Sequence, residues 1–259
     1  MHKDSIEISD VCHVYETQTG PLPVLKNLSL TFPKNSFTAV VGPSGCGKST
    51  LTRLISGLLL PDSGSVSIFG EKVVKPRASV GMAFQNPVLL EWRTILQNVI
   101  LPLEIVGSTL SKSQRKERAR HLLKLVGLEE FEDKRPSELS GGMRQRASLC
   151  RALVHQPELL ILDEPFGALD AFTREDLWQV MHMLRKEEPF TGVLITHDLR
   201  ESVFLTDQVV VLSGRPATTQ YILEVPNLSE RSLDDLYSSQ TIEILNDLRL
   251  QIKVAQQRD

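Results

Sequence analysis

The apolar and polar positions predict strands at the start of the chain. Three stretches have strand character: residues 5–15 (SIEISDVCHVY), 24–32 (VLKNLSLTF) and 36–42 (SFTAVVG). The turn PKNS joins the last two, and Asn35 tolerates a left-handed conformation there at low cost. The segment 48–59 then favours a helix that Gly57 and Pro61 close. Short strands at 64–70 and 78–84 are bounded by glycines.

From about residue 87 to residue 155 the pattern changes to helical spacing. TILQNVILPLEIV, SQRKERARHLLKLVGL and GGMRQRASLCRALV are rich in strong helix formers. Alternation of strands and helices resumes with LLILDEP (159–165) and continues through 173–187, 192–197, 198–205, 207–213 and 219–225. Such alternation predicts a parallel sheet covered on both faces. The region 87–155 is therefore expected to be a helical insertion in an α/β domain.

The end of the chain, residues 228–259, is expected to form a helical tail. Its only strongly periodic part is TIEILNDLRLQIKV, in which Ile242, Leu245, Leu248 and Ile252 share one helical face. We interpret this segment as a helix packed on the domain rather than one that binds a partner. The domain itself is expected to span residues 5–227.

Composition and charge exclude several classes of protein. Apolar residues make up 41% of the 259 residues, charged residues 24%, and the net charge is −3. These values are typical of globular proteins and argue against a nucleic-acid partner, which favours a basic surplus. There is no apolar signal region at the start and no apolar run long enough to cross a membrane. The three scattered cysteines fit a reducing cytoplasm.

The stretch GPSGCGKST is a candidate phosphate-binding loop, because it follows a predicted strand and opens a predicted helix. Its glycines let backbone N–H groups turn toward phosphate oxygens, and the helix N-terminus adds partial positive charge. Lys48 can reach the β- and γ-phosphates, and the Ser49 hydroxyl can ligate Mg²⁺. The candidate ATP-binding residues of this loop are Gly42, Pro43, Ser44, Gly45, Cys46, Gly47, Lys48, Ser49 and Thr50.

Two acidic residues end the apolar run of LLILDEP. The carboxyl edge of an open α/β sheet is where ligands bind. Asp163 is predicted to act on the Mg²⁺ side. Glu164 points differently, since successive strand residues alternate, and it is a candidate general base for an attacking water.

The order of motifs along the chain resembles the nucleotide-binding subunits of ATP-binding-cassette (ABC) transporters. An aromatic residue, the phosphate loop, a glutamine, LSGG, LILDEP, GALD and ITHD follow one another from about residue 5 to residue 225. The resemblance implies an α/β fold: a P-loop NTPase core with a parallel-rich sheet, an N-terminal antiparallel β-subdomain and an inserted α-helical subdomain. It also implies ATP hydrolysis with Mg²⁺.

In that family the LSGG loop serves the ATP held by the other subunit. The resemblance therefore implies a head-to-tail homodimer with two ATP molecules at the interface, in which Ser140, Gly141 and Gly142 contact the partner's nucleotide. Residues that start a helix can bind a phosphate group, because they offer N–H donors and a positive dipole end to an anion. ATP would then close the dimer, and hydrolysis would reopen it.

Four further residues take their roles from the resemblance. Tyr15 corresponds to the aromatic that stacks on adenine, and Gln85 to the glutamine that contacts Mg²⁺ and the attacking water. His197 corresponds to the histidine that touches the γ-phosphate and positions Glu164. Asp170 corresponds to the aspartate that crosses the dimer interface near the opposing phosphate loop. Met143 and Cys150 differ from the residues that are commonest at these positions in the family, but neither is one of the phosphate donors.

The stretch PVLLEWRTILQNVILPLEIVG is expected to include a docking surface for transmembrane permease subunits, although internal packing accounts for many of its residues. Together with SGGMRQR and LSGRP it is similar to importers of nitrate, sulfonates, taurine and pyrimidine precursors. Glu91 stands at a position where proline is frequent in these importers. The subunit is expected at the cytoplasmic face of the membrane, held by the permease, and indirectly served by a periplasmic or extracellular solute-binding protein.

Other classes of nucleotide-binding protein are alternatives. A lipid-transport or export ATPase shares the same core, and so does a non-transport ABC ATPase of the iron–sulfur cluster assembly type. A DNA-repair member would need heptads or cysteine pairs that the chain lacks. A P-loop kinase would leave LSGG and ITHD unexplained.

Overall fold

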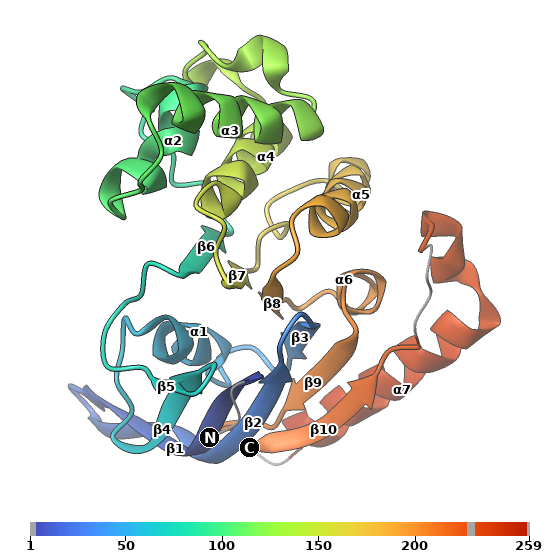
Figure 1. The fold of residues 1–259 in the computed structure, drawn as a ribbon. Coiled ribbons are helices and arrows are strands. Elements are labelled where there is room, and N and C mark those ends of the chain that lie inside the picture. Colours follow the sequence, from blue (N-terminus) through green and yellow to red (C-terminus); the bar gives the residue numbers. More distant parts are fainter. Residues whose placement is uncertain (1–3, 227–230, 258–259) are drawn as a thin grey trace. The chain divides into compact units, whose positions relative to one another are not determined.

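The protein is described by a computed structural model that covers residues 4–226 and 231–257 (Figure 1). Its chain forms two compact units. The first, which we call the core unit, contains the chain up to Arg77 and the chain from Thr191 onward. The second, the insert unit, is Ala78–Phe190.

The core unit begins with an antiparallel sheet. Strands β1 (Ser5–Thr17) and β2 (Gly20–Pro33) form a hairpin, and the sheet order is β2-β1-β4-β5 with β4 at Ser63–Ile68 and β5 at Glu71–Lys72. Buried apolar residues alternate with exposed ones along parts of β1 and β2, and the alternation breaks where the register of the pair shifts. The hairpin is longer than predicted, because Thr17 pairs with Gly20 across a tight turn.

The second sheet of the core unit contains parallel strands. β3 (Phe37–Val41) lies between β8 (Thr191–Ile195) and β9 (Gln208–Leu212), parallel to both, and β10 (Thr219–Glu224) adds antiparallel to β9. Every residue of β3 and β8 is buried, which explains their continuous apolar runs. Helix α1 (Lys48–Ser56) packs on β4 and β8, and α6 (Leu199–Leu205) packs on β3 and β9.

The insert unit combines two parallel strands with four α-helices. β6 (Val80–Phe84) and β7 (Leu159–Asp163) run parallel. The helices are α2 (Ile95–Ile105), α3 (Lys112–Leu125), α4 (Gly141–Leu153) and α5 (Ala171–Glu187). Short 3-10 turns at Glu129–Phe131 and Pro136–Glu138 precede α4. The three helices of the predicted insertion are thus present, with α4 packing on α2, α3 and α5.

The tail contains a 3-10 turn (Leu233–Tyr237) and helix α7 (Ser239–Gln256). The predicted boundary near residue 227 lies outside the described residues. Helix α7 packs on β9, β10 and α6, but the expected apolar face was partly wrong. Leu245 and Leu248 are buried, whereas Ile242 is 47% exposed. The buried face continues instead through Thr241 and Ala255, because small side chains let the helix approach the sheet closely.

Across the described residues, none of the helices has both the length and the apolar character needed to span a bilayer.

Candidate functional site

The phosphate loop leads from β3 into α1 within the core unit. Gly47 caps the helix with φ +118°, and a Cβ there would lie 2.8 Å from Cγ1 of Val24. Only glycine combines that conformation with such a close approach. Gly45 also lies in the left-handed region, with φ +75°. The loop therefore needs glycine at these two positions to turn its backbone inward.

Lys48 is buried and its ammonium group contacts the loop itself. Nζ donates to the carbonyl oxygens of Gly42 (2.9 Å) and Pro43 (2.8 Å). These neutral acceptors satisfy the buried cation, and anionic phosphate oxygens would form stronger bonds with it. Ser44 and Ser49 are exposed on the same loop, whereas the Cys46 side chain is 1% exposed.

Tyr15 lies beside the phosphate loop. Its hydroxyl oxygen is 3.4 Å from Oγ1 of Thr50, which follows Ser49 at the start of α1. The ring of His13 packs edge-on against Tyr15, with centroids 4.7 Å apart. The contact places an aromatic side chain next to the phosphate loop, as the family resemblance implied.

His197 follows β8 at the same sheet edge as the phosphate loop. Val40 of β3 is in register with Ile195 of β8, so Gly42 and His197 each lie two residues beyond paired positions. The His197 side chain is exposed. The core unit therefore brings Tyr15, the phosphate loop and His197 to neighbouring parts of its surface.

The insert unit brings the glutamine and the two acidic residues together. Phe84 of β6 is in register with Asp163 of β7, so Gln85 and Glu164 follow paired positions of adjacent parallel strands. Gln85 is exposed, and both acidic residues are half-buried. A carboxylate, an amide and a second carboxylate thus share one strand edge, and the sequence pattern predicted this edge for the two carboxylates.

Glu164 has an unusual backbone conformation. Its φ is +49°, in the left-handed region that costs a non-glycine residue about 1–2 kcal/mol. A turn holds it there, in which the N–H of Gly167 donates to the Glu164 carbonyl (3.2 Å). Strained residues that persist are concentrated at functional sites.

Ser140, Gly141 and Gly142 form the N-terminus of α4, and we call residues 139–142 the signature loop. The Ser140 Oγ accepts a hydrogen bond from the N–H of Met143 (3.3 Å), so Ser140 is the N-cap. Its hydroxyl proton stays available as a donor, and the residue is exposed. Gly142 is buried against α5, where a Cβ would lie 2.6 Å from Cγ2 of Thr173.

Asp170 is the N-cap of α5 and lies near the signature loop. Its carboxylate accepts from the Thr173 N–H (3.0 Å) and the Thr173 hydroxyl (2.7 Å). The bond from the Thr173 N–H has the larger effect and the bond from the Thr173 hydroxyl the smaller one, and both hold the pKa of the Asp170 carboxyl below its usual value. The contact of Thr173 with Gly142 brings the N-termini of α4 and α5 together.

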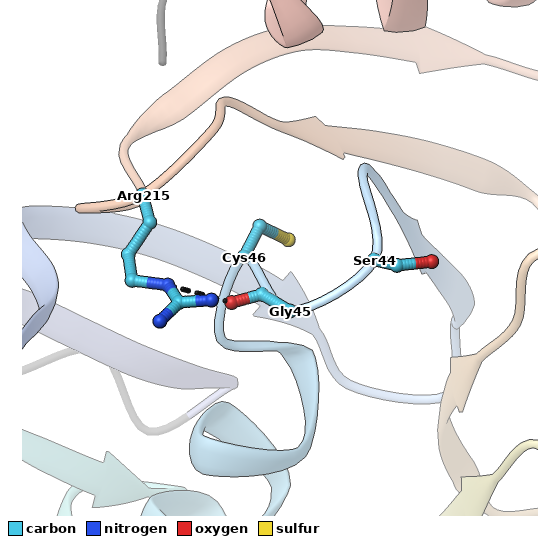
Figure 2. Close-up of a pocket in the computed structure, with 4 residues that line it drawn as sticks. All are labelled: Ser44, Gly45, Cys46 and Arg215. Carbon is cyan, nitrogen blue, oxygen red and sulfur yellow. Dashed lines mark hydrogen bonds between the residues drawn. The ribbon is translucent and has the colours of Figure 1, made fainter.

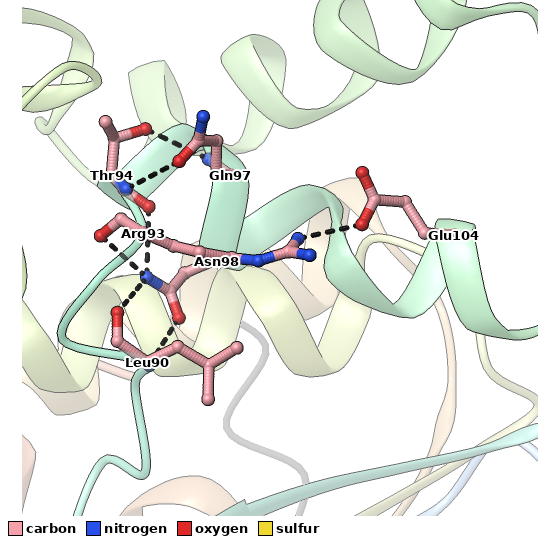
Figure 3. Close-up of polar contacts among 6 residues, drawn as sticks. All are labelled: Leu90, Arg93, Thr94, Gln97, Asn98 and Glu104. Carbon is pink, nitrogen blue, oxygen red and sulfur yellow. Dashed lines mark hydrogen bonds and ion pairs between the residues drawn. The ribbon is translucent and has the colours of Figure 1, made fainter.

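The segment before α2 leaves large apolar side chains exposed on a fixed loop. Figure 3 shows Asn98 of α2 bonded to the loop backbone: Oδ1 accepts from the Leu90 N–H (2.7 Å), and Nδ2 donates to three loop carbonyls. Arg93 pairs with Glu104 at 2.8 Å. Trp92 and Ile105 are nevertheless 73% exposed, and Val88 is 60% exposed. Exposed apolar groups of this kind are typical of an interaction surface.

Two residues near the predicted site residues, His13 and Gln145, were not predicted from the sequence. A third, Arg215, was considered only as part of a subgroup pattern. His13 was overlooked, although its i, i+2 spacing from Tyr15 puts both on one strand face. Gln145 is buried and donates to the carbonyl of Phe84 (3.1 Å), which joins α4 to the residue before Gln85. Arg215 was used only as part of the pattern LSGRP, and no local signal links it to the phosphate loop.

Comparisons with known proteins find similar sequences over most of the chain. The family profile described as "ABC transporter" matches residues 25–167. The bicarbonate transport ATP-binding protein CmpD of Synechocystis sp. is 40% identical over 91% of this chain and 84% of its own length. The nitrate import ATP-binding protein NrtD of Synechococcus elongatus is 42% identical over 82% of this chain and 78% of its own.

A similar solved structure is a dimer. A post-hydrolysis state of the ATP-binding cassette MJ0796, bound to ADP and Pi, has a TM-score of 0.75 and 29% identity. The match covers 86% of this chain and all of the other chain.

Proposed function

The chain belongs to the ABC transporter family, and on that premise we propose that it is the ATP-hydrolysing subunit of an importer for a small solute. Two helix N-termini with glycine at the start carry this proposal. One begins at Lys48 in the core unit, and the other begins at Gly141 in the insert unit. Similarity to ATP-binding subunits of bicarbonate and nitrate importers supports both ATP hydrolysis and import.

ATP is proposed to bind on the core unit. The phosphate loop surrounds the β- and γ-phosphates, and Lys48 exchanges its two carbonyl acceptors for phosphate oxygens. Tyr15 stacks on the adenine, which its position beside Thr50 supports. The exchange is favourable because phosphate oxygens carry charge and backbone carbonyls do not.

The residues proposed to hold Mg²⁺ are Ser49, Gln85 and Asp163. A hydroxyl, an amide oxygen and a carboxylate are hard oxygen donors of the kind that Mg²⁺ prefers, with phosphate oxygens supplying further ligands. These residues would hold an ion that supplies positive charge to offset the charge of the phosphate groups. The adjacency of Gln85 and Asp163 at one strand edge supports this assignment.

Hydrolysis is proposed to proceed by in-line attack of water on the γ-phosphorus. The carboxylate of Glu164 takes a proton from the water as the new oxygen–phosphorus bond forms. The bond between the γ-phosphorus and the bridging oxygen breaks, and its electron pair leaves with ADP. His197 contacts the γ-phosphate and orients Glu164, and Gln85 helps to position the water.

Two chains are proposed to close head to tail around two ATP molecules. The exposed Ser140 hydroxyl and the first N–H groups of α4 would donate to the γ-phosphate held by the partner. Asp170 would cross the interface toward the opposing phosphate loop. The dimeric state of the similar cassette MJ0796 supports this assembly. Loss of the γ-phosphate removes the shared ligand, and the dimer reopens.

The exposed surface formed by Val88, Trp92 and Ile105 is proposed to dock on a transmembrane permease. This contact would hold the subunit at the cytoplasmic face of the membrane. The solute would reach the permease through a periplasmic or extracellular solute-binding protein, and a small anion is the class favoured by the relatives.

Transport can be tested in proteoliposomes that contain the chain with its permease, with the solute-binding protein on the side opposite the chain. ATP supplied on the side of the chain should drive uptake of bicarbonate or nitrate from the opposite side. Trp92→Glu should release the chain from the permease, whereas Leu250→Glu, at an exposed apolar residue of α7, should not. Movement of solute away from the chain's side would indicate an exporter and contradict the proposal.

A further inference from the structure

A loop distant in sequence contacts the phosphate loop. The side chain of Arg215, which follows β9, extends toward the phosphate loop, and its Nε donates to the carbonyl oxygen of Gly45 at 3.0 Å (Figure 2). Ser44, Gly45, Cys46 and Arg215 line a cavity of about 240 Å³. Arg215 therefore touches the loop without belonging to the phosphate-binding motif.

This contact fixes the orientation of one peptide group. The carbonyl of a trans peptide and the following N–H point in opposite directions. Because Arg215 bonds the Gly45 carbonyl, the Cys46 N–H points the opposite way, toward the Pro43 carbonyl. It donates to this carbonyl at 3.3 Å. Gly45 has φ +75°, which is one of several conformations open to glycine, so the bond from Arg215 adds to the Cys46–Pro43 bond in holding this peptide.

The backbone around Arg215 is anchored by two other elements. The N–H of Gly214 donates to the Ala255 carbonyl in the last turn of α7 (3.1 Å). Ala217 exchanges hydrogen bonds with β2: its N–H donates to Val24 (2.8 Å), and its carbonyl accepts from Lys26 (3.1 Å). The guanidinium is thus presented from a loop that is held on both sides.

We propose that Arg215 is a positioning residue for ATP binding, which keeps the Gly45–Cys46 peptide in the orientation that a phosphate group requires. The inference rests on the proposed role of the loop in ATP binding. Without Arg215 the loop samples other peptide orientations, and the apparent affinity falls with the fraction of competent loop. Its cationic side chain also adds positive potential beside the phosphates.

The test is a series of substitutions at Arg215 in the full chain. A fluorescent ATP analogue measures Kd, and phosphate release measures KM and kcat. Arg215→Ala is expected to raise Kd and KM roughly tenfold, the size associated with loss of one charged hydrogen bond, with a smaller change in kcat. Arg215→Lys should recover part of the affinity, since an ammonium can still donate to Gly45. Arg77→Ala, which removes a surface partner of Glu71, is the matched control.

Hydrogen exchange provides a second readout that does not depend on turnover. The amides of the phosphate loop should lose protection in Arg215→Ala and keep it in Arg77→Ala. If Arg215→Ala binds the analogue as tightly as the wild type, or if its loop amides keep their protection, the positioning role is wrong. Failure of the wild type itself to bind the analogue would instead contradict the proposed ATP site.

Discussion

The phosphate loop and the signature loop both lead into a helix, but they differ in how their polar groups are already used. In the phosphate loop, Lys48 donates to two loop carbonyls, and Arg215 donates to a third. In the signature loop, Ser140 caps its own helix and keeps an exposed hydroxyl. The polar groups of the first loop are bonded to carbonyls within it, whereas the second loop leaves the Ser140 hydroxyl exposed. The difference favours separate roles in one dimer.

The largest expected difference between the loops is in ATP binding by the separate chain. Lys48→Ala should weaken binding at least about tenfold, because it removes charged hydrogen bonds to phosphate. Ser140→Ala should leave binding by the monomer unchanged and still lose most ATPase activity. Titration with a fluorescent ATP analogue and phosphate-release assays measure the two effects. Equal loss of monomer binding in both variants would mean that both loops hold the same chain's nucleotide.

Two adjacent glycines of the signature loop should respond differently to alanine. A Cβ at Gly142 would lie 2.6 Å from Thr173, whereas one at Gly141 would lie 3.7 Å from Leu169. Gly142→Ala should lower the free energy of unfolding by about 1–3 kcal/mol through overpacking. Gly141→Ala should not lower it, since alanine favours helix. Urea unfolding measures both, and Thr173→Ser should restore the Gly142→Ala variant by removing the clashing methyl group.

The conformation of Glu164 predicts opposite effects on stability and activity. Asparagine adopts the left-handed region more readily than glutamate, so Glu164→Asn should raise the free energy of unfolding by about 1 kcal/mol. The same change should abolish ATP hydrolysis. Glu164→Gln is the matched control, because it removes the charge and keeps the strain. A loss of stability in Glu164→Asn during urea unfolding would contradict this account.

The smallest expected effect concerns pH and Asp170. Because hydrogen bonds from Thr173 lower the folded-state pKa of this carboxyl, its contribution to stability is present above its usual pKa. That contribution is lost as pH falls through the lowered pKa. The wild type should therefore exceed Asp170→Asn in stability near neutral pH and lose the advantage in acid. Unfolding at several pH values measures the difference, with the exposed Asp176→Asn of α5 as control. A difference that grows in acid would have the wrong sign.

Local patterns in the sequence predict most of the fold. The buried strands β3, β7, β8 and β9 are predominantly apolar, and the caps of α1 at Gly57 and of α4 at Ser140 are residues with strong terminal preferences. The fold class and the ATPase are confirmed by the family match and the similar structure. The individual roles of the site residues stay predictions.

Other features depend on contacts that no local pattern contains. Arg215 and Gly45 are 170 positions apart, and the bond between them follows from where β9 ends. The expected face of α7 included Ile242, because helical spacing alone cannot tell which apolar residues meet the sheet. The left-handed φ of Glu164 follows from the turn after β7 rather than from a glycine or asparagine at that position.

The central claim is that the signature loop completes the ATP site of a second chain. Light scattering of Glu164→Gln at saturating ATP tests it most directly, because this variant binds ATP without hydrolysing it. We expect the mass of a dimer with ATP, of a monomer without it, and of a monomer again when Ser140→Arg is added. A monomer at saturating ATP, or a dimer that persists with Ser140→Arg, would contradict the claim.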